Sequence, residues 1–325
     1  MIGSGMRKLA GAAAAVAMSL IAAAALAYPD KPIHLIIPQP PGGAVDVVGR
    51  MIAEQLRAAL GQPVVAENRA GAAGVIAAES VAKAVPDGYT LLFGGGSTHG
   101  ANSAVKRKLP YDPIKDFAPI SLLVRAEWGM FVNPSFPAKT PAELIALAKA
   151  KPRTINFASS GLGAASHLIM EQFMAMSGIE LVHIPYKGSV AAQIGVISND
   201  AQVVIDGVGN AAAQAKAGKL KMIAVASDRR SPLAPNTPTI AESGVPGFEA
   251  TSAFGIYAPA GTPKDVVMTL NRALVNALKQ PDLRQWLISQ AYEIVGSSPE
   301  QLGEEVAREV KKWQQLVRER NLKFD

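Results

Sequence analysis

From Ile33 onward, short apolar runs alternate with segments in which apolar residues recur every three or four positions. The run from Ile33 to Ile37 fits a buried strand, and the segment from Val45 to Leu60 fits an amphipathic helix that Gly61 ends. Strands that alternate with helices build parallel sheets with helices on both faces. The sequence therefore predicts an α/β fold.

The alternation falls into two sets. Further strands are expected at 64–65 and 91–93, then at 154–158, 181–185, 203–206 and 222–226, and finally at 254–258. Helices are expected near 75–81, 166–176, 189–197 and 209–217. Three further helices are expected to begin at Thr140, Thr262 and Ser298, and capping boxes are expected at Thr140 with Glu143 and at Ser298 with Gln301.

The N-terminus has the layout of a secretory signal peptide. Arg7 and Lys8 precede an apolar run that ends in Ala25, Leu26 and Ala27, so cleavage is expected after Ala27. The alternative is an uncleaved membrane anchor, because the run approaches the roughly 18 to 20 residues that span a bilayer. With 1–27 removed, the net charge falls from +6 to about +4. The chain has no cysteine that could carry a lipid.

The charge pattern gives no sign of a nucleic-acid partner, because no Lys/Arg cluster is interleaved with aromatic residues. The densest basic run, at 106–108, is interpreted as a solvated loop. A mild positive excess is compatible with an anionic ligand.

Several separate motifs occur in a fixed order along the chain. They are PGGAVD (41–46), ENRAGA (67–72), PDGYTLL (86–92), LPYDP (109–113) with KDF (115–117), SGLG (160–163) with HL (167–168), PYKG (185–188), PTIAESG (238–244) and APAGTP (258–263). In these motifs the chain resembles the substrate-binding receptors of tripartite tricarboxylate transporters, the Bug or TctC-like family. Ala70, Phe254 and the turn at 198–200 depart from the family's usual residues.

The resemblance implies a two-lobe periplasmic binding protein of the Venus flytrap type, with parallel or mixed sheets flanked by helices and with crossing strands between the lobes. It also implies discontinuous lobes: 28–124 with 234–325 form lobe 1, and 125–233 form lobe 2. The implied function is capture of a small carboxylate for the membrane subunits of a transporter. We expect a monomer with no cofactor, no metal and no catalytic residue; a ligand sensor for a membrane kinase and, with less support, a secreted hydrolase are the alternatives.

Glycine-rich loops between strands and helices suit such a ligand, because unpaired N–H groups and the positive helix end favour an anion. Gly42 and Gly43 let the backbone approach closely, although they would also suit a simple tight turn. Asp46 is interpreted mainly as a residue that shapes this loop, with contact to a ligand amino group or water as the alternative. Lys187 is either a ligand contact or an exposed loop charge.

The predicted ligand-binding residues come from the loops that follow the strands of both lobes. They are Gly42, Gly43, Ala44, Asp46, Ser97, Thr98, Ser160, Gly163, Ala164, Ser166, His167, Tyr186, Lys187, Gly188 and Asp206.

The sequence has none of the common motifs of an enzyme active site. Gly95 to His99 lacks the closing glycine of a nucleophile elbow, and the glycines near 161 lack the dinucleotide-binding pattern. The four histidines do not have metal-ligand spacing. His99 is the histidine whose structural role is least secure, because it lies close to Ser97.

Overall fold

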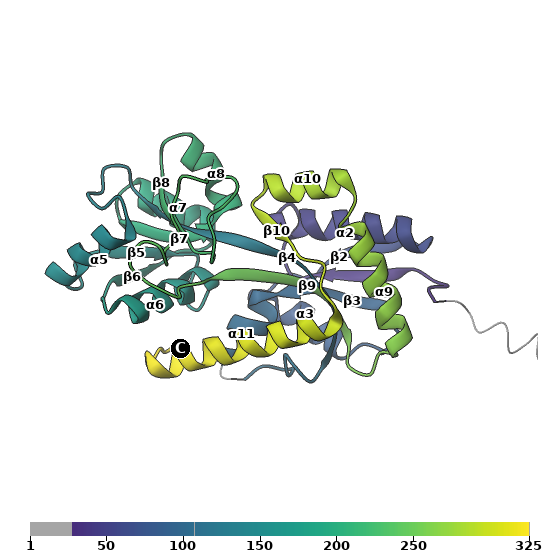
Figure 1. Cartoon of the computed structure of the whole chain (residues 1–325). Coiled ribbons are helices and arrows are strands. Elements are labelled where there is room, and N and C mark those ends of the chain that lie inside the picture. The colour runs from purple at the N-terminus through teal and green to yellow at the C-terminus, as the bar shows by residue number, and fades with distance from the viewer. Residues whose placement is uncertain (1–27, 107, 325) are drawn as a thin grey trace, which may run out of the picture.

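The computed structural model describes residues 28–106 and 108–324, so the predicted signal peptide lies outside the described residues. Two lobes lie side by side and are joined by two long antiparallel strands (Figure 1). These crossing strands are β4 (Phe117–Val132) and β9 (Thr251–Pro259). No helix in the described part of the chain is long and apolar enough to cross a membrane.

Lobe 1 is built on the strand order β2-β1-β3-β9-β4, in which β1 is parallel to both neighbours and β9 is antiparallel to β3. Its elements are β1 (Ile33–Ile37), α2 (Ala44–Leu60), β2 (Val64–Asn68), η1 (Ala72–Gly74), α3 (Val75–Ala82), β3 (Thr90–Gly95), η2 (Gly96–Ala101), α4 (Asn102–Val105), α9 (Lys264–Ala277), α10 (Pro281–Ser289), β10 (Tyr292–Ile294) and α11 (Pro299–Glu319). Separate apolar clusters lie on the two faces of this sheet.

Lobe 2 continues the same path as β4-β7-β5-β6, with β8 also paired to β4. Its elements are α5 (Pro141–Ala150), β5 (Asn156–Ser159), α6 (Ala165–Ser177), β6 (Val182–Pro185), α7 (Ser189–Ile197), β7 (Val203–Gly207), α8 (Val208–Lys216) and β8 (Lys221–Val225). Strand β5 is parallel to β6 and β7, whereas β7 is antiparallel to β4. The structure therefore confirms the predicted α/β class with mixed sheets.

The expected strands and helices are present with small shifts at their ends. The capping box at Ser298 is complete, because Ser298 and Gln301 exchange side-chain to backbone hydrogen bonds. At Thr140 only half of the expected box forms: Thr140 Oγ1 accepts the Glu143 N–H, but the Glu143 carboxylate accepts the N–H of Lys139 instead. The prediction of a full box there was wrong because the Glu143 side chain reaches one residue further back.

Strand β4, which has the most partners, was not predicted from the sequence. It pairs with β9, β7, β8 and β10, and its register shifts twice along β9. Consecutive β4 residues are buried at 120–124 and at 129–132, so both faces are covered, and a bulged strand of this kind has no period of two. Helix α10 and strand β10 were also not anticipated.

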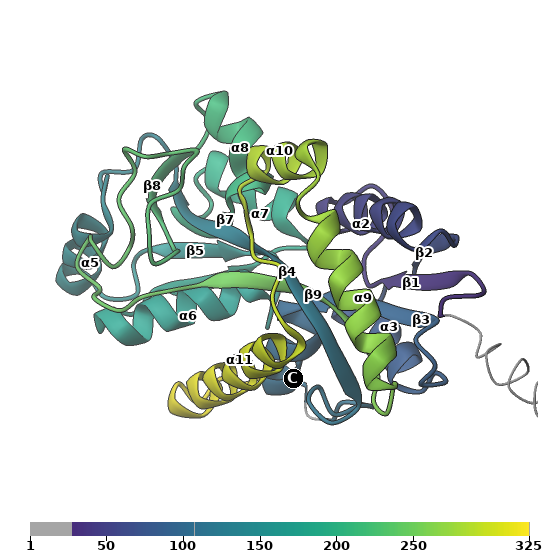
Figure 2. The same ribbon diagram turned by 45° about the vertical axis from the view of Figure 1, so that its right-hand side comes forward.

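Two segments cross between the expected lobes. Residues 234–250 were expected to belong to lobe 1. In the structure, Ile240, Val245 and Phe248 of this segment lie in the core of lobe 2. Helix α11 packs Leu302 against lobe 1 and Leu316 against lobe 2, and it runs beneath both lobes in Figures 1 and 2.

Candidate functional site

A cavity of about 490 Å³ lies between the lobes, beside the crossing strands. Loops from both lobes and side chains from β4 and β9 line it. The lining residues are Gln39, Ala73, Gly96, Ser97, Ala101, Asn102, Val105, Lys106, Trp128, Ser160, Gly161, Leu162, Gly163, Ala164, Ala165, Gly188, Ser189, Ser252 and Phe254. A ligand held here would therefore contact both lobes.

Two helices of lobe 2 begin at this cavity. Ala164, the N-cap residue of α6, and Ala165, its first residue, both line the cavity. Gly188 and Ser189 do the same at the start of α7. Because the N-terminus of a helix carries unpaired N–H groups and a partial positive charge, two such ends favour an anionic group.

The loop before α6 is held by its own hydrogen bonds. Ser166 Oγ accepts the N–H of Ser160 at 2.9 Å, and the two hydroxyls lie 3.0 Å apart. The N–H of Gly163 donates to His167 Nδ1 at 3.1 Å. Ser166 and His167 thus fix the shape of the loop from inside lobe 2, while Ser160 and Gly163 reach the cavity.

Asp206 lies behind the start of α7. Its carboxylate is buried and accepts hydrogen bonds from the Ser189 hydroxyl, from Gln193 Nε2 at 2.8 Å and from the Gly207 N–H at 2.7 Å. Ser189 is the cavity-lining member of this group, so Asp206 orients a hydroxyl that can meet a ligand.

In lobe 1, β3 ends at Gly95, and η2 begins beside the cavity with Gly96 and Ser97. A side chain at Gly95 would place its Cβ 1.9 Å from the carbonyl oxygen of Ala253, so glycine is what lets β3 approach β9 here. Gly96 and Ser97 line the cavity. Thr98 does not, because its hydroxyl turns inward to the Gly95 N–H at 2.9 Å and to His99 Nδ1 at 3.0 Å.

Asp46 shapes the loop after β1. Its carboxylate is 3% exposed and accepts the Gly42 N–H at 2.9 Å, Asn68 Nδ2 at 2.7 Å and Arg50 Nε at 3.0 Å. Burial acts to raise the pKa of Asp46, but these hydrogen bonds outweigh it and the pKa is lowered. Asn68 Nδ2 also donates to the carbonyl of Gln39, which lines the cavity. This geometry supports the loop-shaping interpretation of Asp46.

The crossing strands supply the aromatic wall. Trp128 on β4 donates its indole N–H to Ser252 Oγ on β9 at 2.9 Å, and Phe254 lies two residues further along β9. Phe254 was noted in the sequence only as a departure from the family pattern. Trp128 and Ser252 had no local sequence signal, because pairing of two distant strands is what brings them to the cavity.

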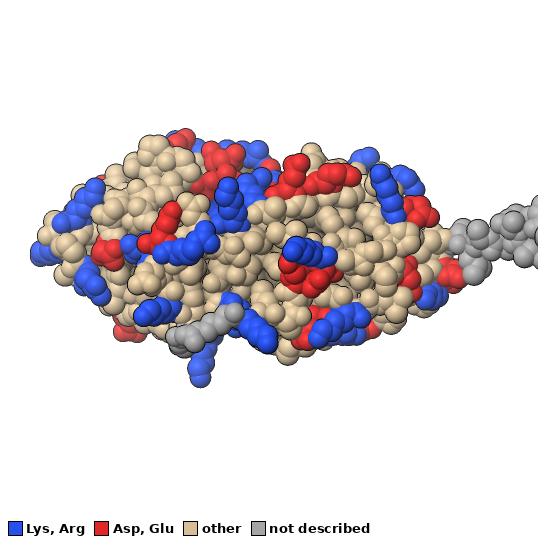
Figure 3. Space-filling view, turned by 90° about the horizontal axis from the view of Figure 1, so that it is seen from below, with Lys and Arg blue, Asp and Glu red and all other residues tan. Residues whose placement is uncertain are grey.

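Among the described residues that line the cavity, Lys106 is the charged one, and none is Asp or Glu. The rest of the lining is hydroxyl, amide, aromatic and small apolar groups. Elsewhere on the surface, the face in Figure 3 carries positive and negative side chains interspersed. The cavity itself thus favours an anion with an apolar body.

Five of the predicted site residues line the cavity: Ser97, Ser160, Gly163, Ala164 and Gly188. Nine others are not among the lining residues: Gly42, Gly43, Asp46, Thr98, Ser166, His167, Tyr186, Lys187 and Asp206. The side chain of Ala44 lies outside the described part of the structure. Tyr186 packs its ring against Gly195 on α7, and Lys187 is exposed. Ligand contact by these residues stays a prediction.

His99 does not form a catalytic pair with Ser97. It is buried in lobe 1, where its ring stacks on Tyr257 with centroids 3.9 Å apart, and burial lowers its pKa to about 3. No hydrogen bond between Ser97 and His99 occurs in the described structure. Among the described residues, no three His, Cys, Asp or Glu side chains gather as a metal site would require.

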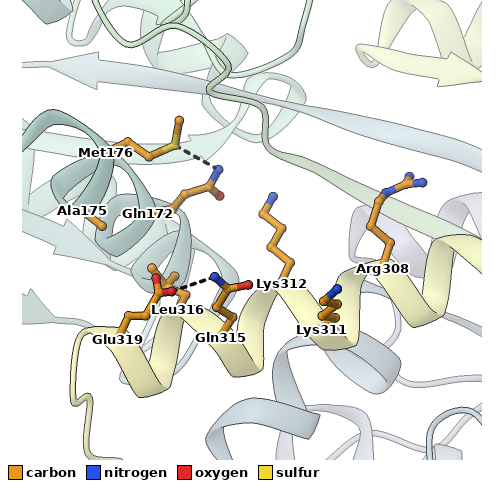
Figure 4. Close-up of a pocket in the computed structure, with 9 residues that line it drawn as sticks. All are labelled: Gln172, Ala175, Met176, Arg308, Lys311, Lys312, Gln315, Leu316 and Glu319. Atoms are coloured by element: carbon orange, nitrogen blue, oxygen red, sulfur yellow. Dashed lines mark hydrogen bonds between the residues drawn. The ribbon is translucent and has the colours of Figure 1, made fainter.

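A second hollow, of about 350 Å³, lies between α6 and α11 (Figure 4). Its described lining comes from these two helices, with Gln172 and Met176 on one side and Arg308, Lys312 and Gln315 on the other. It is open on the outer surface and has no loop backbone among its lining residues, so the interlobe cavity is the better candidate for ligand capture.

Two α/β lobes joined by crossing strands around a cavity define a two-lobe solute-binding protein of the periplasmic type. The sequence pattern of the family described as "Tripartite tricarboxylate transporter family receptor" matches residues 48–322. The chain belongs to this family.

Solved structures of similar proteins agree. The chain is 34% identical to an R. palustris protein described with adipate, with a TM-score of 0.79 and coverage of 90% of this chain and 97% of the other. It is 32% identical to MatC from Rhodopseudomonas palustris with bound malate (TM-score 0.77; coverage 89% and 100%). It is 34% identical to the periplasmic binding protein BugD (TM-score 0.77; coverage 91% and 99%). The predicted resemblance to Bug and TctC-like receptors is confirmed.

Proposed function

We propose that this protein is a periplasmic receptor that captures a small carboxylate between its lobes and delivers it to the membrane subunits of a tripartite transporter. The observation that carries the proposal is the start of α6 and α7 at a cavity whose described lining has no acidic side chain. Such helix starts stabilise a carboxylate without a paired cation.

The size and lining of the cavity support a ligand with an apolar portion. About 490 Å³ holds a small organic acid, and Trp128, Phe254 and Leu162 offer apolar surface beside the polar helix starts. Adipate and malate are the ligands named for two similar proteins, and both are dicarboxylates. Lys106, on the lobe 1 side, is positioned to meet a second anionic group.

The proposed mechanism is closure of the lobes about β4 and β9. A ligand that contacts both lobes binds the closed form more tightly than the open form, and that difference in affinity shifts the population toward closure. The membrane subunits would then recognise the closed form. The protein supplies no catalytic step in this proposal, and export through cleavage after Ala27 would place it in the periplasm.

Thermal unfolding of residues 28–325 tests the ligand class. Adipate, malate, citrate, benzoate and glutamate would be compared with adipamide, benzamide and glucose. A ligand at about a hundred times its dissociation constant adds roughly 2.7 kcal/mol to the free energy of unfolding, which a melting scan resolves. We expect stabilisation by one or more carboxylates and by none of the amides. Stabilisation by amides or glucose alone would contradict the proposal.

A ligand already bound after purification would hide this effect. Denaturation and refolding release such a ligand. Native mass spectrometry of the protein before and after this treatment detects it. If the refolded protein binds none of the carboxylates and no carboxylate is released, the proposed ligand class is wrong.

A further inference from the structure

The last helix, α11, connects lobe 1 to the ligand loop of lobe 2. Its first half packs Leu302 and Val306 in lobe 1, and its second half packs Trp313 and Leu316 with Phe157 in lobe 2. Figure 4 shows the second half of α11 beside α6, the helix that begins at the cavity. The end of the chain is therefore anchored on the element that presents the ligand loop.

Arg320, directly after α11, makes the polar part of this contact. Its Nε donates to Glu171 Oε2 on α6 at 3.0 Å, and its Nη1 donates to Glu180 Oε1 at 2.8 Å. The Arg320 side chain is 21% exposed and the Glu171 side chain only 7%. A buried carboxylate needs a charged or hydrogen-bonded partner, so Arg320 determines where the Glu171 carboxylate lies.

The other oxygen of Glu171 faces His167. Oε1 lies 3.5 Å from His167 Nε2, while His167 Nδ1 accepts the N–H of Gly163 at 3.1 Å. Because Nδ1 accepts the Gly163 N–H, Nε2 is the ring nitrogen that can donate toward the carboxylate. His183 stacks on the same ring at 3.9 Å, so the imidazole is held both by stacking and by Glu171.

The far end of this series of contacts is the cavity. Gly163 has φ +74, and the position of a Cβ there would lie 3.2 Å from Val105 and 3.3 Å from the ring of Phe324. Phe324, four residues beyond Arg320, also meets the edge of His167 at 5.8 Å. The loop from Ser160 to Ala164 is thus held from outside by the C-terminal residues and from inside by His167.

We propose that Arg320 is a positioning residue for the ligand loop at 160–164, acting through Glu171 and His167. That this loop meets the ligand rests on the proposed function, because the loop lines the interlobe cavity. Holding the loop in one shape reduces the entropy lost on binding, so Arg320 raises ligand affinity without touching the ligand.

Hydrogen exchange of the ligand-free chain from Tyr28 to Asp325 tests the connection directly. Arg320→Ala should make the amides at 160–167 exchange about tenfold faster, while peptides from α2 and α9 stay at the wild-type rate. Arg318→Ala is the matched control, since Arg318 is exposed and lies in the same last turn of α11. Arg320→Lys keeps the positive charge but loses the two separate N–H donors that reach Glu171 and Glu180. Its exchange rate at 160–167 should therefore lie between those of the wild type and Arg320→Ala. Wild-type exchange at 160–167 in Arg320→Ala, or faster exchange everywhere, overturns the proposal.

A mutant cycle with Glu171→Gln separates positioning from general stability. If Arg320 acts through Glu171, the double variant should exchange at 160–167 no faster than the more affected single variant. If the increases in exchange rate of the two single variants multiply in the double variant, the two residues act independently, and the proposal is overturned.

Titration with adipate and with malate follows. For whichever acid binds the wild type, Arg320→Ala should raise Kd about five- to tenfold, and Arg318→Ala should leave Kd unchanged. An unchanged Kd in Arg320→Ala counts against positioning. If neither acid binds the wild type, only the proposed function is affected, because the exchange experiment needs no ligand.

Discussion

The indole N–H of Trp128 on β4 donates a hydrogen bond to the hydroxyl of Ser252 on β9 across 2.9 Å. Both residues line the interlobe cavity, and both belong to the strands that cross between the lobes. The same pair therefore contributes to the wall of the ligand site and to the junction about which the lobes would close.

Trp128→Phe should weaken carboxylate binding. The variant keeps an aromatic ring in the wall but removes the donor to Ser252, and the loss of one net hydrogen bond corresponds to roughly a two- to tenfold rise in Kd. Isothermal titration measures it. Trp286→Phe is the control, since Trp286 stacks on Tyr292 in lobe 1, away from the cavity. Equal Kd values for the two variants would show that the bond plays no part in binding.

Lys106→Gln should reduce affinity for dicarboxylates more than for monocarboxylates. Lys106 is a charged residue of the described cavity lining, so its removal takes away a Coulomb attraction that salt screens. We expect about a three- to tenfold rise in Kd and a weaker dependence of Kd on ionic strength. Lys108→Gln, an exposed neighbour outside the lining, serves as the control. A similar effect of both substitutions would indicate general attraction by the basic run and no direct contact.

Ser189→Ala should weaken binding. The hydroxyl is bonded to Asp206 and reaches the cavity at the first residue of α7, so its loss removes an oriented polar contact. About a two- to tenfold rise in Kd is expected. Ser198→Ala, at the other end of the same helix, should leave Kd at the wild-type value. The prediction fails if the two alanine variants bind equally well.

Asp46→Asn should destabilise the protein at neutral pH by about 1–3 kcal/mol, because the carboxylate accepts three hydrogen bonds that an amide cannot all replace. The folded-state pKa of Asp46 is lowered, so the unfolded chain binds the proton more readily. The stabilisation is therefore complete above the unfolded pKa of about 4 and is lost as pH falls through the folded value. Urea unfolding at pH 7, 5, 4 and 3 measures it. A stability difference between wild type and variant that stays constant down to pH 3 would contradict this assignment.

Much of the fold could be predicted because its signals are local. The strand that begins at Ile33 is a short run of apolar residues, and the helix before Gly61 has apolar residues every three or four positions. Gly61 ends that helix because it adopts a positive φ. Both signals come from residues that are close together in the chain. The start of α11 follows from Ser298 and Gln301, three residues apart. Strand β4 could not be predicted in the same way, because its bulges and its burial on both faces remove the period of two.

The candidate site was predicted in part. The loops at Ser97, Ser160 and Gly188 reach the cavity, as strand-end loops in α/β proteins commonly do. Thr98, Ser166 and His167 lie within a few residues of these positions, but their polar atoms form hydrogen bonds with neighbouring backbone or side chains. Which of two adjacent polar residues faces a ligand depends on competing hydrogen bonds, and those are formed only in the folded chain.

The sequence by itself determined the alternation of strands and helices, the caps, the glycine-rich loops and the family, because each depends on residues close together in the chain or on motifs in order. Only the tertiary structure decided that Trp128 and Ser252 share one wall and that Arg320 reaches Glu171. Those pairs are separated by 124 and 149 positions. Contacts over such separations follow from strand pairing and core packing of the whole chain, and no local pattern encodes them.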